Sequence, residues 1–224
     1  MTVGNLREVS TKAKASSPRV IRGLDAEQRK QQRRDALLDA AVDLFASQGF
    51  VGTSIEQICN HAYVGTKGFY ETFTSRDDLY AALLQRVTDT ALGHMAEFFA
   101  GLDDDVDEET ATSLLVAEFA HAFVDDVRLA KVTFGEGSAI TPAAERQRRG
   151  NRRNAAAFLE SIWARYGHDV SAKHHGVAIG VIGGLFDIVA DWVLELESET
   201  PTPGETEVVI GRLQNFYAAV RHGL

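Results

Sequence analysis

Residues 53–73, TSIEQICNHAYVGTKGFYETF, constrain the fold of this chain more than any other stretch, because they read as two short helices joined by a tight turn. Thr53 and Glu56 have the spacing of a capping box, with Thr53 at the N-cap and Glu56 at N3. An apolar stripe at helical spacing follows, formed by Ile55, Ile58 and Ala62. Gly65 then breaks the pattern, and the second helix starts there or at the next residue. The stretch predicts a helix-turn-helix pair, although any two amphipathic helices would give a similar pattern.

The second of these helices is too short to bury a core of its own, and its two faces differ. Phe69 and Phe73 lie one turn apart on the face expected to point inward. The opposite face carries small, basic and hydrogen-bonding side chains: Thr66, Lys67, Gly68, Tyr70 and Thr72. Such a face suits insertion into the major groove of DNA. A glycine inside a helix costs about 1 kcal/mol relative to alanine, so Gly68 indicates a close approach to a neighbouring group.

Helices on either side complete this unit. A longer helix is expected over about 26–48, closed by Gly49 at the C′ position, and another is opened by Ser75 with Asp78 at N3. In this setting, residues 37–84 resemble the TetR/AcrR-type transcriptional regulators. The shared features are AAxxLFxxxGFxxTS, an apolar-x-x-apolar first helix, and the run V-x-T-basic-x-F-Y-E-x-F-x-S-R-x-x-L.

Two residues of the turn depart from the family pattern. Tyr63 stands where a glycine is usual, and Gly65 stands where a serine is usual, so the helix start shifts toward Thr66. The resemblance implies an all-α fold with an N-terminal three-helix helix-turn-helix DNA-binding domain. It also implies a C-terminal helical domain for ligand binding and dimerisation. The operator sequence does not follow from it.

The resemblance assigns roles within the DNA-binding part. Thr53 matches a position where these regulators place a hydroxyl against a phosphate, and Tyr70 and Arg76 match positions that contact the DNA backbone. The alternatives are a half-buried packing role for Tyr70 and a solvated helix-start charge for Arg76. The positions expected to face the groove, the last three of them able to read base edges, are Gly65, Thr66, Lys67 and Thr72.

Charge is divided unevenly along the chain. Residues 1–86 carry a net charge of +2 and residues 87–224 carry −11, within a total of −9. This argues against non-specific nucleic-acid binding by the second half and leaves it open for the first. We expect a disordered basic tail over 1–25, a DNA-binding domain over 26–75, and a helical effector-binding and dimerisation domain over 76–224. The tail either lies on DNA or is an inert solvated segment.

The second half reads as helix throughout. A long helix begins at about 76, ends at Gly101 and connects the two domains. Breaks rich in glycine, proline or polar residues then separate further helices. These are expected over about 108–126, 127–134, 142–166, 169–197 and 205–222. No catalytic motif is evident, which predicts that the protein is not an enzyme and uses no cofactor. Adjacent histidines point to different helix faces, so His174 and His175 do not predict a metal site.

The penultimate helix contains four glycines, three of them spaced four residues apart as a smooth ridge. They cost about 4 kcal/mol relative to alanines, which close packing across a two-fold axis, or room for a ligand, would offset. In the resembled family the last two helices of each subunit form a four-helix dimer interface. We therefore predict a homodimer with an interface that contains Gly176, Gly180, Gly184, Leu213, Phe216 and Tyr217. Asp187 and Asp191 interrupt the apolar run, which argues against a membrane span.

An effector pocket, implied by the resemblance, is expected between the long connecting helix and the helices that follow it. Residues predicted to line it are Phe99, Phe119, His121, Phe123, Phe158, Trp163, Phe186 and Asp187, although each aromatic is equally a candidate for plain core. An acidic stripe (Asp187, Asp191 and Glu195) and a block of five arginines within residues 146–153 accompany it. These stripes are either salt-bridged or solvated faces, or an acidic pair in a cavity recognises a cationic effector.

Together these features predict a homodimeric transcriptional repressor with two recognition helices about 34 Å apart on a near-palindromic double-stranded DNA operator. An unidentified small-molecule effector would shift the long connecting helix and so change the affinity for DNA. The alternative is a constitutive or protein-partnered regulator with a second domain that only dimerises. A cavity of several hundred Å³ would favour the first reading, and a small, dry core the second. The lack of a signal-like segment and the single cysteine predict a cytoplasmic location.

Overall fold

The computed structural model describes residues 25–135, 141–168, 170, 172–196 and 201–221. Within these ranges the chain forms helices and no strands, which confirms the predicted all-α fold. In chain order the helices are α1 (Ala26–Gln48), α2 (Ile55–His61), α3 (Thr66–Tyr70), α4 (Arg76–Ala100), α5 (Glu108–Val124), α6 (Val127–Phe134), α7 (Pro142–Arg165), α8 (Ala172–Glu195) and α9 (Pro203–Arg221).

Helix boundaries follow capping residues. The Asp25 side chain accepts a hydrogen bond from the Gln28 amide at 2.8 Å. The Gln28 side chain accepts in turn from the Asp25 amide, which completes a capping box at the start of α1. Gly49, with φ of 74°, ends that helix. Ser75 caps α4 by accepting from the Asp78 amide at 3.1 Å. The expected ranges of α1 and α6 agree with the structure, and the expected basic tail lies, apart from Asp25, outside the described residues.

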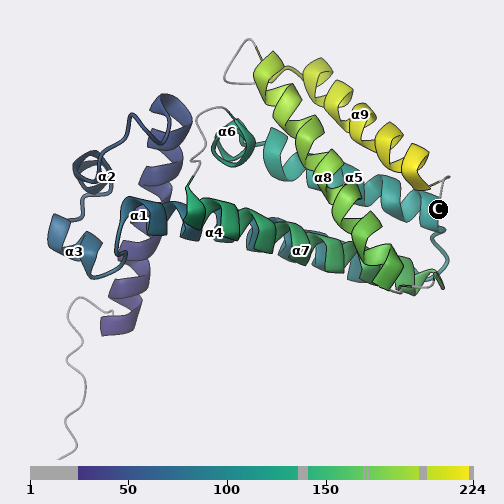
Figure 1. Cartoon of the computed structure of the whole chain (residues 1–224), viewed down its shortest axis with the longest axis horizontal. Helices are drawn as coiled ribbons and strands as arrows, with labels where there is room; N and C mark the ends of the chain where they lie inside the picture. Colours follow the sequence, from purple (N-terminus) through teal and green to yellow (C-terminus); the bar gives the residue numbers. More distant parts are fainter. Residues whose placement is uncertain (1–24, 136–140, 169, 171, 197–200, 222–224) are drawn as a thin grey trace, which may run out of the picture.

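The helices form two parts joined by α4 and α6 (Figure 1). α1, α2 and α3 lie at one end, and α4 runs from that end toward a bundle made with α5 to α9. Within the bundle α4 packs on α7, α7 on α8, and α5 on α9. α6 packs on both α1 and α8. Buried apolar side chains form one continuous cluster through both parts.

An aromatic cluster lies where the two parts meet. The rings of Phe45, Phe50 and Tyr80 lie with their centroids 5.3–5.5 Å apart. Tyr80 is fully buried, and its hydroxyl donates to the carbonyl oxygen of Val132 on α6 at 2.6 Å. A buried hydroxyl without such a partner would be costly. Tyr80 therefore fixes α4 both to α1 and to α6.

α8 contains a long apolar stretch. Over His174–Glu195 its mean hydropathy is 2.0, which is enough for a membrane span by length and composition alone. The core helix of a water-soluble protein passes the same test, and α8 packs on α6, α7 and α9. Asp187 and Asp191 are exposed along it. These contacts account for α8 as a helix of the bundle core.

Candidate nucleic-acid interface and apolar cavity

The capping box predicted at Thr53 and Glu56 is wrong by one residue. Ser54 is the N-cap of α2, and its hydroxyl accepts from the Gln57 amide at 3.1 Å. The Gln57 side chain in turn accepts from the Ser54 amide at 2.7 Å. In the sequence, Thr53 with Glu56 and Ser54 with Gln57 both have the spacing of a capping box. The burial of Thr53 decides between the two pairs.

Thr53 is 1% exposed, so its hydroxyl is not available to a phosphate in this structure. It donates to the carbonyl oxygen of Gly49 at 2.8 Å and accepts from the Gln48 side chain at 3.2 Å. These bonds tie the end of α1 to the start of α2. The phosphate contact predicted for Thr53 is therefore replaced by a structural role, set by the turn after Gly49.

The turn between α2 and α3 explains one departure from the family pattern. Tyr63 has a φ of 54°, a conformation that favours glycine and is uncommon for other residues. Its side chain is 97% exposed, so no packing compensates for the backbone strain. The glycine usual at this position in the resembled family would adopt the same φ without a Cβ.

α3 buries one face and exposes the other, as predicted. Phe69 is 0% and Phe73 2% exposed, while Thr66, Lys67 and Tyr70 are exposed. The N-cap of α3 is Gly65, which provides no side-chain cap. Thr72 is half-buried, and its hydroxyl donates to the carbonyl oxygen of Gly68 at 2.9 Å. Of the predicted groove-facing residues, Gly65, Thr66 and Lys67 are exposed.

Gly68 fits the close approach expected from its place inside a helix. A Cβ at this position would lie 3.0 Å from Cγ1 of Val64 and 3.7 Å from Cδ of Arg33. The glycine therefore lets α3 seat against Val64 in the turn. Nearby, Glu71 lies 3.5 Å from Arg33 and 3.9 Å from Lys67, so one carboxylate serves two cations beside the exposed face.

Arg76 is held by the protein itself. Its guanidinium donates to the carbonyl oxygen of Thr53 and lies 4.2 Å from the centre of the Phe50 ring. These two contacts offset part of the electrostatic cost of placing a cation at the start of a helix. Arg76 thus ties the first turn of α4 to the loop before α2, and its contact with DNA backbone stays a prediction.

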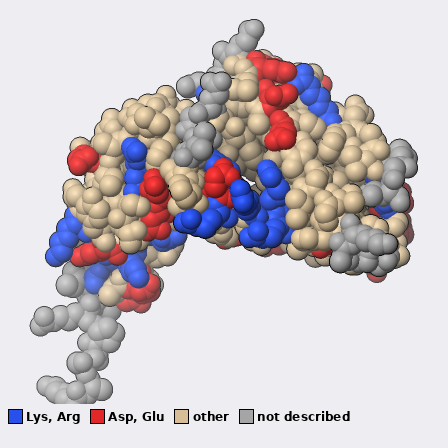
Figure 2. Space-filling view, in the orientation of Figure 1, with Lys and Arg blue, Asp and Glu red and all other residues tan. Residues whose placement is uncertain are grey.

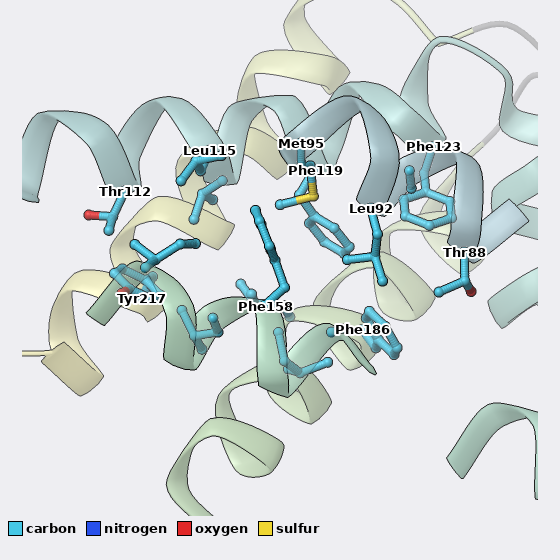
Figure 3. Close-up of a pocket in the computed structure, with 17 residues that line it drawn as sticks. Thr88, Leu92, Met95, Thr112, Leu115, Phe119, Phe123, Phe158, Phe186 and Tyr217 are labelled. Atoms are coloured by element: carbon cyan, nitrogen blue, oxygen red, sulfur yellow. The ribbon is translucent and has the colours of Figure 1, made fainter. Parts of the chain in front are cut away.

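An apolar cavity of about 60 Å³ lies in the bundle between α4, α5, α7, α8 and α9 (Figure 3). Thr88, Thr112 and Tyr217 are the polar residues of its lining, and none of the described residues that line it is charged. The Phe119 ring stacks on that of Phe186 at 5.9 Å. Typical ligand sites measure about 300–1,000 Å³. The cavity is therefore apolar and smaller than a typical ligand pocket.

Half of the residues predicted to line a pocket are found there: Phe119, Phe123, Phe158 and Phe186. The prediction was wrong for Phe99, His121, Trp163 and Asp187, which lie elsewhere. Phe99 packs edge-on against Phe158 at 6.3 Å from outside the lining. His121 and Asp187 are exposed, and His121 pairs with Asp125 at 3.0 Å. Trp163 is buried but contacts Tyr217 rather than the cavity.

Tyr217 was predicted at a dimer interface, yet it lines the cavity. It is 6% exposed, and its hydroxyl accepts from Nε1 of Trp163 at 3.0 Å. Burial raises the pKa of this phenol above its ordinary value. Thr112 and Met95 also line the cavity and were missed. The available signal was that both belong to apolar stripes of their helices.

Comparison with known proteins follows from this geometry. Residues 37–83, which include the whole of α2 and α3, match the family described as bacterial regulatory proteins, tetR family. The likeness to the TetR family covers residues 37–83, about a fifth of the chain.

Two relatives match part of the chain. HTH-type transcriptional regulator HbdR of Aromatoleum sp. (strain CIB) is 38% identical over 60 residues, 27% of this chain and 26% of HbdR. HTH-type transcriptional regulator RutR of Escherichia coli (strain K12) is 36% identical over 66 residues, 30% of this chain and 31% of RutR. The chain thus spans between a quarter and a third of the length of these relatives. Both relatives are named as transcriptional regulators.

Solved structures extend the likeness to the second domain. The transcriptional regulator FadR from Bacillus subtilis, in complex with stearoyl-CoA, has a TM-score of 0.64 to this chain at 17% identity. The match covers 81% of this chain and 98% of that one. At such low identity the likeness shows a shared fold, which includes the architecture of the bundle.

Ionic contacts connect the bundle to the DNA-binding part. Arg128 on α6 lies 2.6 Å from Asp43 on α1 and 2.7 Å from Asp126. Asp43 also lies 2.9 Å from Nε2 of His61, the last residue of α2. Hydrogen bonds from Arg128 outweigh burial and lower the pKa of the Asp126 carboxyl. One carboxylate of α1 therefore contacts both α6 and α2.

The outer face of α8 and α9 differs from the predicted interface. Gly176 and Gly180 are exposed, with no atom within 4 Å of a Cβ placed there. Gly184 instead makes room for its own chain, because a Cβ there would overlap the Phe216 ring of α9. Leu213 is fully buried inside the protein. The open part of the glycine ridge is therefore Gly176 and Gly180 alone.

Proposed function

We propose that this protein is a homodimeric DNA-binding transcription regulator with a second domain that responds to an apolar small molecule. The observation that carries the proposal is the exposed, hydrogen-bonding and basic face of α3 on a buried aromatic base. The match of residues 37–83 to the TetR family supports it. The domain division at 26–75 and 76–224, the repressor role and the cytoplasmic location are parts of the same proposal.

On the DNA side, α3 enters the major groove. Thr66 and Lys67 face base edges, and Tyr70 contacts the backbone. Two copies related by a two-fold axis place their recognition helices about 34 Å apart. Such a dimer selects a near-palindromic operator.

On the effector side, the ligand is uncharged and apolar. None of the described residues lining the cavity could neutralise a buried charge, which would be costly in such surroundings. The acidic pair suggested for a cationic effector is excluded from this role, because Asp187 faces solvent. The stearoyl-CoA held by FadR from Bacillus subtilis supports the idea that this fold accommodates long apolar groups.

Binding would enlarge the cavity and move α4. One wall of the cavity is formed by Thr88, Ala91, Leu92 and Met95 of that helix. The other end of α4 begins at Arg76, which is bonded to the loop before α2. A ligand changes DNA affinity only through its different affinity for the two arrangements. The direct connection through one helix provides such a difference.

A second candidate is favoured by one observation, the small cavity volume of about 60 Å³. A regulator with a closed, dry bundle would bind DNA constitutively or answer to a protein partner. Its second domain would then only dimerise. Both candidates share the DNA-binding part and differ in whether the cavity opens.

The test of DNA binding uses the purified full-length protein and the DNA that flanks its own gene. Footprinting and fluorescence anisotropy at two salt concentrations should show one protected, near-palindromic site. Lys67→Ala and Tyr70→Ala should lose this site, while Lys131→Ala, which removes the same charge from α6, should keep it. Weak, unlocalised binding that modest salt abolishes would indicate phosphate attraction alone and would refute the proposal for this DNA.

A further inference from the structure

Three exposed arginines in the N-terminal half of α7 have no ion-pair partner among the described residues. Arg146, Arg149 and Arg153 are exposed, and no ion pair joins any of them to the described part of the chain. Their spacing places all three within one side of the helix. Arg152 has a buried Nε without a hydrogen-bond partner among the described residues. This concentration of positive charge stands out in a half of the chain with a net charge of −11.

The C-terminal half of α8 carries two acidic side chains that also lack an ion-pair partner among the described residues. Asp187 and Asp191 are exposed, lie one helical turn apart, and form no ion pair within the described ranges. Glu195, the third member of the predicted acidic stripe, is already paired with Arg212 of α9 at 2.6 Å. Two like charges at this spacing repel each other in an isolated helix.

The two charged groups lie on neighbouring helices. α7 and α8 pack together and are joined by a short connection, so the start of α7 lies beside the end of α8. Arg152 confirms this register, because its Nε lies 4.0 Å from where a Cβ of Gly183 would be. Figure 2 shows basic side chains gathered in the middle of one face, with acidic side chains above them toward the upper end of α8. They border one surface without neutralising each other within the chain.

We propose that this surface pairs with a second copy of the chain, so that the α7 arginines of one copy face the α8 aspartates of the other. The inference rests on the homodimer in the proposed function and names the contacts that select it. In a two-fold interface, if one residue contacts a second across the axis, the second also contacts the first. Each charge pairing therefore occurs twice.

The outer face of α8, on the N-terminal side of its aspartates, suits such an approach. Gly176 and Gly180 are exposed and have nothing within 4 Å of a Cβ, so the backbone of α8 can come close to a partner. Rotation about an axis that lies between the basic and acidic groups brings each over its opposite. Charge complementarity of this kind sets the partner and the register more than the affinity. The unpaired charges on each copy thus discourage other alignments.

Charge reversal provides a direct test. One variant carries Arg149→Asp and Arg153→Asp, and a second carries Asp187→Arg and Asp191→Arg. All four residues are exposed, so both variants should keep the helical content and melting behaviour of the natural protein. Each variant alone should dimerise at least about tenfold more weakly at moderate salt, because every crossed contact becomes repulsive. A mixture of the two should form the heterodimer, in which every crossed contact is attractive again.

The control variant carries Asp103→Arg and Asp105→Arg, the same charge change in the loop between α4 and α5, and should dimerise normally. Differently tagged proteins, measured by analytical ultracentrifugation and native mass spectrometry, report the homodimers and heterodimer. A monomeric natural protein would overturn the proposed homodimer itself. A natural dimer with both variants unaffected, or no preference for the heterodimer, would overturn only the charge pairing. A loss of DNA affinity in the arginine variant with dimerisation unchanged would also overturn the charge pairing, and it would assign the arginines to DNA.

Discussion

The helix-turn-helix and the cavity region of the bundle handle their polar groups in different ways. Around α2 and α3, hydroxyls and a guanidinium bind backbone carbonyls, as Thr53, Thr72 and Arg76 do, and fix a short segment that has little core of its own. In the bundle, the cavity walls are almost entirely apolar and leave a small space unfilled. Directional bonds specify one arrangement, whereas apolar contacts allow repacking. The difference suggests a rigid part that presents chemistry outward and an adaptable part that can admit a ligand.

The largest effect should come from the base of the recognition helix. Phe69→Ala removes a fully buried ring and should cost about 3–5 kcal/mol of unfolding free energy. Tyr70→Ala, the adjacent exposed aromatic, should cost less than about 0.5 kcal/mol. Urea denaturation of the two variants separates these effects. Equal costs would mean that α3 is not seated as described.

Two matched substitutions compare the packing of α1 with the packing beside the cavity in the bundle. Ala41→Leu adds volume at a fully buried position in α1 and should cost about 1–3 kcal/mol. Ala91→Leu adds the same volume beside the cavity and should cost less than about 1 kcal/mol. Thermal and urea unfolding measure both. If Ala91→Leu proves the more damaging, the cavity is not available space.

The strained turn offers a stabilising change. Tyr63→Gly should raise the unfolding free energy by about 1 kcal/mol, because a left-handed residue with a Cβ costs roughly 1–2 kcal/mol and glycine's greater unfolded-state freedom returns part of it. Tyr63→Ala keeps the Cβ and removes the ring, so it serves as the control and should not stabilise. A destabilised glycine variant would show that the exposed tyrosine ring contributes to the fold.

The smallest effect concerns pH and the far end of the bundle. Burial raises the pKa of Glu108, but hydrogen bonds from Arg221 and His168 outweigh it, and the net pKa is lowered. A lowered folded-state pKa adds stability above the unfolded value of about 4.3, and this stability is lost as the pH falls through the folded pKa. Glu108→Gln should therefore cost up to about 1 kcal/mol at pH 7 and progressively less in acid.

Urea denaturation at pH 7 and below pH 4 compares Glu108→Gln with Glu109→Gln, an exposed neighbour. The second variant should show no such pH dependence. An equal cost for Glu108→Gln at both pH values would show that the ion pair with Arg221 does not account for the lowered pKa.

Local patterns predicted much of the fold, since caps and breaks act within a few residues. Gly49 ends α1 as predicted, and the separation of Phe69 from the exposed face of α3 follows from helical spacing. The shift from Thr53 to Ser54 at the α2 cap could not be predicted, because both satisfy the same local rule. Only the tertiary burial of Thr53 decides it.

The inner and outer faces of α9 could not be separated for a related reason. Leu213, Phe216 and Tyr217 are all apolar or aromatic, so a core contact and a subunit contact look alike in sequence. The structure buries Leu213 and Tyr217 within the chain and sets Phe216 against Gly184. His121 and Asp187 were placed near a ligand because they interrupt apolar helices, yet each lies on the solvent side of its helix.

The most direct test of a rigid DNA-binding part coupled to an adaptable bundle is the operator affinity measured with and without apolar ligands. Decanol and naphthalene are suitable probes, and Ala91→Leu, which fills the cavity, is the matched control. The account predicts that saturating probe lowers the operator affinity of the natural protein by about tenfold and leaves that of Ala91→Leu unchanged. An operator affinity that neither probe alters would contradict the coupling and leave a constitutive regulator. An equal loss in both proteins would place the ligand outside the cavity.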